Sequence, residues 1–161
     1  HIALADTTFL SDTTGANLEI LARKPLWDEC EDFRHSTGHG VGFFLNVHEG
    51  PQRISLYANT PFYPGMITSI EPGLYREGRH GIRIENIYLT RKYRENEYGQ
   101  FLRFDVLGFV PIQKKLIETA MLSFEELVWL NAYHQRVYDK LCPYLNEAEK
   151  TWLYEQCAPL S

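Results

Sequence analysis

The chain has 161 residues, of which 44% are hydrophobic and 14% are aromatic, which is enough for one domain with a buried core. Its 16 basic and 21 acidic residues leave a net charge of −5, with no long run of either sign. This charge pattern excludes nucleic acid and anionic membrane surfaces as the main partners.

The sequence also predicts where the protein resides. No apolar run approaches the roughly 20 residues that a spanning helix needs, and the first residues lack the pattern of a signal peptide. Cys30, Cys142 and Cys157 are widely spaced and form no CxxC pair, which favours free thiols in a reducing compartment. We therefore expect a soluble, cytoplasmic protein. The start at His1, inside a helical pattern, suggests a fragment, with a processed mature protein as the alternative.

The first part of the chain is predicted to be helical. Residues 1–10 have a mildly helical pattern, and turn residues then precede a second helix on which Leu18 and Leu21 share one face. Pro25 lacks a backbone donor and is expected to kink or restart this helix. The helix is expected to end by about Phe33.

The middle of the chain is predicted to be a β-meander. Residues 40–47 are small and β-prone and suggest an extended segment, whereas 49–65 have three prolines and suggest a loop. Residues 66–75 and 81–93 are predicted to form two antiparallel strands around a turn. Residues 100–110 are predicted to form a third strand of the same sheet.

The last third is predicted to be helical, with a well-marked start. Ser123 and Glu126 have the spacing of a capping box. One face of the helix that follows is apolar apart from a single histidine: Leu127, Leu130, His134, Val137 and Leu141. A histidine in such a row is expected to be structural.

A short closing helix follows. Asn146 and Glu149 have the spacing of a second cap. Trp152, Leu153 and Cys157 are expected to form the buried face of this helix.

The chemistry is concentrated between His35 and Gly50, where three histidines alternate with glycines. A hard, water-activating divalent cation prefers oxygen ligands with one or two imidazoles. One histidine and two later carboxylates could supply such a set: His39, Glu71 and Glu85. Alternation along a strand would put Arg83 beside Glu85 on an inner face, where a glutamate needs a cation. Taken singly, each of these residues could equally be a surface or satisfied polar residue. HExxH, paired CxxC, GxSxG and phosphate-loop motifs do not occur.

Five segments, taken in chain order, resemble the segments of a known protein family. They are HSTGHGVGFFLNVHEGP (35–51), PGMITSIEPGLY (64–75), GIRIENIYL (81–89), FLRFDVLGFVPIQKKLI (101–117) and WLNAYH (129–134). Their ordered set resembles the C-terminal part of the Xaa-Pro aminopeptidases (aminopeptidase P), within the pita-bread metallopeptidase family that also includes methionine aminopeptidase and prolidase. The final helical segment resembles the extension of the three-domain, eukaryotic-type enzymes.

This resemblance implies an α+β fold. The chain would form the second half of a pita-bread fold, a curved antiparallel sheet with helices on its outer face, followed by a helical C-terminal extension. Residues 1–161 would form a single domain, with 1–110 as the half pita-bread core and 111–161 as the extension. Apolar surface left by the missing half favours association. The intact protein would be a homodimer.

The resemblance also implies a site. His39, Glu71 and Glu85 match metal ligands of a centre that most often holds two manganese ions. Glu71 would also be the general base, and Glu85 would bridge the two ions. The substrates would be peptides with proline in the second position, from which the first residue is released.

Further residues match positions around that centre. His48 matches a histidine that contacts the substrate near the scissile bond and helps move protons. His35 matches a histidine lining the substrate site, and Arg83 matches an arginine that orients carboxylates. The other histidines match no position with a known role: His1, His80 and His134.

The chain departs from the family pattern in its aspartates. The family uses five protein ligands, two of them from a DGT…D strand pair, and none of the early aspartates here has that context: Asp6, Asp12, Asp28 and Asp32. We therefore expect an aminopeptidase as the intact parent and a nearly inactive isolated chain. The alternatives are a non-catalytic pita-bread module that binds protein or peptide, and a structural or adventitious mononuclear site.

Overall fold

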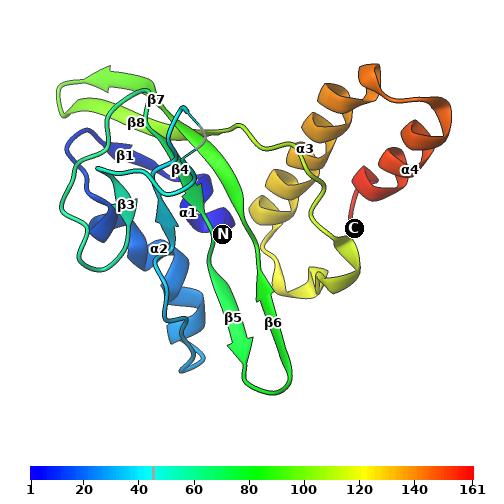
Figure 1. Ribbon diagram of the computed structural model, residues 1–161, viewed down its shortest axis with the longest axis horizontal. Coiled ribbons are helices and arrows are strands. Elements are labelled where there is room, and N and C mark those ends of the chain that lie inside the picture. Colours follow the sequence, from blue (N-terminus) through cyan, green and yellow to red (C-terminus); the bar gives the residue numbers. More distant parts are fainter. Residues whose placement is uncertain (45) are drawn as a thin grey trace. The chain divides into compact units, whose positions relative to one another are not determined.

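The computed structural model describes residues 1–44 and 46–161. The chain divides into two compact units, which consist mainly of Ala3–Gly108 and Phe109–Ser161 (Figure 1). Their boundary lies next to the predicted division at residue 110, and the description of the whole chain as one domain stays a prediction. Within the described residues, no helix is both long and apolar enough to cross a membrane. All three cysteines are free, as expected.

The first unit is built on an antiparallel sheet of four strands. Its strand order is β1 (Thr8–Leu10), β8 (Gly99–Val106), β7 (Asn86–Asn96) and β4 (Ile67–Ile70). The predicted third strand is therefore confirmed, although it ends at Val106.

The prediction of helix over residues 1–10 is wrong for its second half. Only α1 (Ile2–Ala5) is helical, whereas Thr8–Leu10 pairs with β8, with Phe9 opposite Leu102. Three residues carry too little periodicity to reveal a strand, and pairing with a distant segment decides their conformation.

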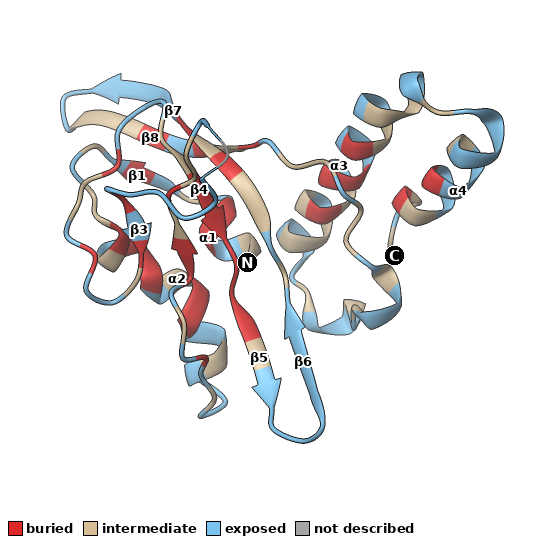
Figure 2. Ribbon diagram, in the orientation of Figure 1, coloured by how far each residue is buried: buried red, intermediate tan, exposed pale blue. Residues whose placement is uncertain are grey.

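Helix α2 (Gly15–Trp27) agrees with the predicted second helix. Thr14 and Asn17 form a capping box at its start, and the helix continues through Pro25 to Trp27. Pro25 lies in the last turn, where its missing N–H costs the helix the hydrogen bond to the Leu21 carbonyl without ending it. Leu18 and Ala22 are buried, and Figure 2 shows buried segments along α2.

The two long central strands are each divided. The segment 66–75 separates into β4 and β5 (Gly73–Arg76), and 81–93 belongs to β6 (His80–Arg83) and β7. Strand β4 pairs with β7 in the main sheet, while β5 and β6 form a separate antiparallel pair. The predicted antiparallel pairing is right, but the continuity of the strands is wrong.

A proline accounts for this break. Pro72 has no N–H for a ladder, and its carbonyl instead accepts the Ile84 amide at 3.2 Å. Glu71 and Glu85 stand next to these two residues, at the points where the strands leave one sheet and enter the other. Both carboxylates are thereby freed from regular strand geometry.

The segment 40–47, predicted to be extended, forms no regular strand among its described residues. The extended segment lies earlier, at β2 (Gly38–His39), which pairs with β3 (Arg53–Ile54). Gly40 adds one isolated bridge to Thr68, and the described residues from 41 to 47 form no strand. Leu45 lies outside the described residues.

Aromatic rings fill the core of the first unit. Phe9, Phe62 and Phe104 are buried, and their ring centroids lie 5.0 to 5.9 Å apart. Tyr88 of β7 adds a fourth ring, 6.2 Å from that of Phe104. The rings pack β1, β7, β8 and the loop before β4 against one another.

The second unit is helical. Its main elements are α3 (Phe124–Leu141) and α4 (Glu147–Cys157), and both predicted capping boxes are present. Three short 3₁₀ turns complete it: Lys114–Leu116, Thr119–Met121 and Cys142–Tyr144.

The buried faces of these helices largely follow the predicted pattern. In α3 the buried residues are Leu130, Tyr133, His134 and Val137. In α4 Leu153 and Cys157 are buried, but Trp152 is 58% exposed, so its predicted burial is wrong. A single turn separates Leu153 from Cys157, and that narrow stripe is all that α4 buries.

Candidate metal centre

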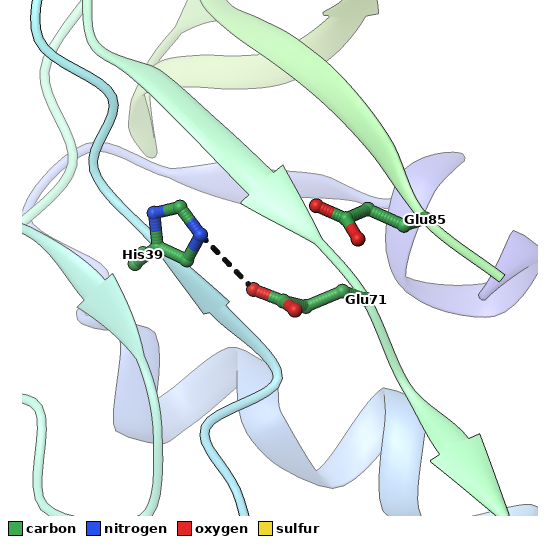
Figure 3. Close-up of side chains that lie close together, drawn as sticks. All are labelled: His39, Glu71 and Glu85. Carbon is green, nitrogen blue, oxygen red and sulfur yellow. Dashed lines mark ion pairs between the residues drawn. The ribbon is translucent and has the colours of Figure 1, made fainter. Parts of the chain in front are cut away.

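Three side chains from distant segments converge in the first unit. His39 ends β2, Glu71 follows β4 and Glu85 precedes β7 (Figure 3). One ligand atom of each lies within 4.8 Å of the others. His39 Nε2 and Glu71 Oε1 are 3.2 Å apart. The structure thus brings together the three residues that the sequence predicted as ligands.

Glycines on both sides of His39 make this approach sterically feasible. A Cβ atom on Gly38 would stand 2.0 Å from the carbonyl oxygen of Ser69, and one on Gly40 would stand 1.9 Å from that of Glu49. Both neighbours are backbone atoms that cannot swing aside. Gly38 therefore lets the histidine backbone lie against β4, and Gly40 lets it lie against the backbone at Glu49.

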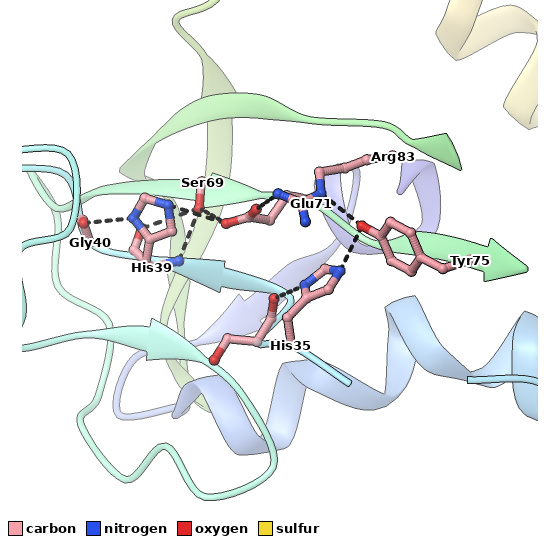
Figure 4. Close-up of polar contacts among 8 residues, drawn as sticks. His35, His39, Gly40, Ser69, Glu71, Tyr75 and Arg83 are labelled. Atoms are coloured by element: carbon pink, nitrogen blue, oxygen red, sulfur yellow. Dashed lines mark hydrogen bonds and ion pairs between the residues drawn. The ribbon is translucent and has the colours of Figure 1, made fainter. Parts of the chain in front are cut away.

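Ser69 joins two of the predicted ligands. Its hydroxyl oxygen accepts the His39 backbone N–H at 3.0 Å, and the hydroxyl donates to Glu71 Oε1 at 3.0 Å. Ser69 is fully buried. The hydroxyl therefore fixes the backbone of the histidine relative to the carboxylate of the glutamate (Figure 4).

Glu71 is held from its other side by Arg83. Arg83 Nη1 donates to Glu71 Oε2 at 3.0 Å, and Arg83 Nε donates to the Tyr75 hydroxyl at 2.8 Å. That hydroxyl lies 2.9 Å from His35 Nε2, so a chain of contacts runs from Glu71 to His35 (Figure 4). The hydrogen bond to Tyr75, with the nearby Glu71 and Glu85 carboxylates, raises the pKa of Arg83 despite its partial burial.

The hydrogen bonding of His39 fits a cation. Its Nδ1 lies 3.0 Å from the Gly40 carbonyl oxygen and donates to it, because a carbonyl can only accept. A neutral ring then carries its lone pair on Nε2, which faces the Glu71 carboxylate. Two lone pairs at that distance need a metal ion or a proton between them. The donor set of one imidazole and two carboxylates fits a hard divalent ion.

The two glutamates differ in their surroundings. Glu71 is 7% exposed and has three partners, Ser69, Arg83 and His39. Glu85 is exposed, and within residues 1–44 and 46–161 its carboxylate has no hydrogen-bond or ion-pair partner. The predicted inner face carrying Arg83 and Glu85 is wrong, because β6 ends at Arg83 and all its residues are exposed.

His48 and His35 both lie near this cluster. His48 is exposed, and its ring centroid lies 4.1 Å from that of His39. Both histidines line a pocket of about 310 Å³. His35 is half-buried and contacts the cluster through Tyr75. All six predicted site residues thus fall in one region, whereas Ser69 and Tyr75 were not predicted.

Comparison with known proteins finds relatives along the whole chain. The model of metallopeptidase family M24 matches residues 1–92, and that of the C-terminal region of peptidase M24 matches residues 100–160. A probable Xaa-Pro aminopeptidase P of Coprinopsis cinerea is 43% identical over 99% of the chain and 27% of that protein. Aminopeptidase P1 of Arabidopsis thaliana is 41% identical over 100% of the chain and 26% of that protein.

Solved structures give the same result. The crystal structure of X-prolyl aminopeptidase from Caenorhabditis elegans, described as a cytosolic enzyme with a di-nuclear active site, is 40% identical, with a TM-score of 0.89 over 99% of this chain and 27% of that one. Prolidase from Pyrococcus furiosus is 32% identical, with a TM-score of 0.51 over 63% of this chain and 28% of that one. The predicted α+β pita-bread fold is confirmed. The chain spans about a quarter of the length of the relatives it matches.

Proposed function

Because the chain belongs to metallopeptidase family M24, we propose that it forms the C-terminal part of an Xaa-Pro aminopeptidase, which removes the first residue of peptides with proline in the second position. The observation that carries this proposal is the convergence of His39, Glu71 and Glu85 in a chain that is similar to such enzymes along its entire length. The intact protein is proposed to be a cytoplasmic homodimer.

The metal centre is proposed to hold two manganese ions. His39 Nε2 and the carboxylates of Glu71 and Glu85 would hold them, with two further aspartates in the intact protein. When bound, such ions supply a nucleophile from water at neutral pH and polarise the substrate carbonyl. Oxygen-rich sites with a single imidazole suit manganese better than zinc or copper.

The side chains of this chain then have separate tasks. Glu71 accepts the proton of the attacking water, while Arg83 and Ser69 hold its carboxylate in place. His48, exposed beside His39, donates a hydrogen bond to the oxygen of the scissile carbonyl and moves protons. His35 forms a wall of the substrate site.

The isolated 161-residue chain is proposed to be nearly inactive. It offers three of the five ligands, and the sequence contains no DGT…D pair. A non-catalytic module that binds peptides is the second candidate, and this incomplete ligand set is the observation that favours it.

Release of arginine from Arg-Pro-Pro with added manganese tests the proposal. The measurement compares this chain with the longer protein whose reading frame continues upstream of His1. We expect cleavage by the longer protein and its loss in the His39→Ala and Glu85→Ala variants. Wild-type activity in either variant would overturn the assignment. Binding of the peptide without cleavage would establish the non-catalytic module.

Strong activity of the 161-residue chain would affect only one part of the proposal. It would contradict the argument from the missing aspartates and leave the peptidase assignment in place.

A further inference from the structure

Arg53 stands directly opposite His39 in the β2–β3 pair. Side chains of directly opposite residues in an antiparallel pair project to the same face, with Cβ atoms about 5 Å apart. The guanidinium of Arg53 therefore belongs to the face that carries the His39 ring. Arg53 is exposed, and across residues 1–44 and 46–161 its side chain makes no hydrogen bond or ion pair.

Two pockets share Arg53 as part of their wall. The first is the pocket of about 310 Å³ that is lined by His39 and His48. The second, of about 350 Å³, is lined by His35 and Arg34 as well as Arg53. A peptide that passes from His39 towards His35 would therefore pass Arg53.

In the second pocket the acidic residue has a charged partner, whereas two of the arginines have none among the described residues. Its one acidic residue, Asp32, pairs with Arg23. Burial alone would raise the pKa of Asp32, but hydrogen bonds from Trp27, the Phe33 amide and Arg23 lower it, so Asp32 is ionised at neutral pH. Arg34 and Arg53 have no acidic partner in the described part of the chain.

The first pocket gives Arg53 no partner either. Its acidic residue is Glu49, whose carboxylate lies against Gly42, with Oε2 2.1 Å from the position of a Cβ there. Glu49 forms no ion pair with Arg53 among the described residues. The guanidinium thus remains available to a ligand.

We propose that Arg53, assisted by Arg34, binds a carboxylate of the peptide substrate on the C-terminal side of the scissile bond. This inference rests on the proposed peptidase function and names a substrate preference of that site. Guanidinium groups bind carboxylates through two parallel hydrogen bonds. The N-terminal ammonium of a peptide would be repelled by two arginines, which fixes the orientation. The carboxylate comes from the C-terminus of a short peptide or from an acidic side chain.

The test uses the longer protein and three peptides: Arg-Pro-Pro, its C-terminal amide, and Arg-Pro-Glu amide. The Arg53→Gln variant is expected to lower the ratio of kcat/KM for acid over amide about fivefold, the size of an exposed ion pair, mainly through KM. A comparable fall for Arg-Pro-Glu amide would identify side-chain carboxylates as ligands too. Arg79→Gln removes the same charge from an exposed turn and should keep the wild-type ratio.

An equal loss on acid and amide in Arg53→Gln would overturn the proposal, because a general structural defect would explain it. Calorimetric binding of the same peptides separates this inference from the proposed function. If the wild-type protein cleaves no peptide, the peptidase assignment fails. In that case, an Arg53-dependent preference for binding the acid would still support the carboxylate site, and its absence would refute it.

Discussion

His39 in the first unit and His134 in the second show two uses of the same side chain. His39 donates from Nδ1 to a carbonyl, which leaves Nε2 facing Glu71 at 3.2 Å. His134 is fully buried, and its Nε2 accepts the backbone N–H of Ile112 at 3.1 Å. A donor bond to the backbone leaves a lone pair for a cation, whereas an acceptor bond uses that lone pair. The direction of one hydrogen bond therefore separates a ligand histidine from a structural one.

The largest effect is expected from His39→Ala. In the longer protein this change should lower kcat/KM for Arg-Pro-Pro by about a thousandfold or more, because the ligand set loses its only imidazole. Thermal unfolding should change less than in a variant of the fully buried His134, since the His39 ring is partly exposed and lies against the exposed ring of His48. A variant that loses stability to the same degree as activity would remove the contrast with His134.

His134→Ala should show the opposite behaviour. Loss of a buried ring and of the partner of the Ile112 amide is expected to cost about 2–4 kcal/mol of unfolding free energy. Activity per folded molecule should equal that of the wild type. Urea unfolding combined with active-site titration measures both quantities, and a loss of specific activity would show that His134 has a role beyond structure.

Ser69→Ala tests how firmly the first unit positions its ligands. Removal of the hydroxyl that links His39 to Glu71 should weaken manganese binding about tenfold to a hundredfold. Ser69→Thr keeps the hydroxyl and should restore much of that affinity. Thr90→Val is the matched control, because it removes a buried hydroxyl of the same sheet that has no hydrogen-bond partner. Equal metal affinity in Ser69→Ala and the wild type would contradict the positioning role.

The smallest expected effect is the pH dependence of the unfolding free energy that His134 of the second unit contributes. Burial, with the nearby positive charge of Lys114, lowers the pKa of His134. The unfolded chain, with an ordinary value near 6.5, therefore takes up the proton first. Stability is retained above about pH 6.5 and falls below it, by at most about 1.4 kcal/mol per pH unit.

His134→Gln should remove this part of the pH dependence, while His80→Gln, at an exposed position, should retain it. Urea midpoints between pH 8 and pH 5 measure both. An unchanged slope in His134→Gln would show that other groups cause the acid sensitivity.

Local sequence rules worked best where the determinant is local. The capping boxes at Ser123 and Asn146 need only residues three positions apart, and both form. The site residues were predicted because an ordered set of motifs resembles a known family. Spacing alone left His39, Glu71 and Glu85 open to other interpretations.

The sequence-based predictions failed where contacts between distant segments determine the conformation or the role of a residue. Thr8–Leu10 becomes a strand only because β8 pairs with it, and the central strands divide where Pro72 cannot donate. Ser69 and Tyr75 lie within SIEPGLY, but their roles depend on His39, Arg83 and His35 reaching them in space. No periodicity in the sequence encodes such contacts.

Anomalous diffraction from a manganese-soaked crystal of the longer protein tests the central claim most directly. The account predicts anomalous peaks within about 2.0–2.4 Å of His39 Nε2 and of carboxylate oxygens of Glu71 and Glu85. A crystal in which manganese binds elsewhere, or in which these three side chains ligate no ion, would contradict it.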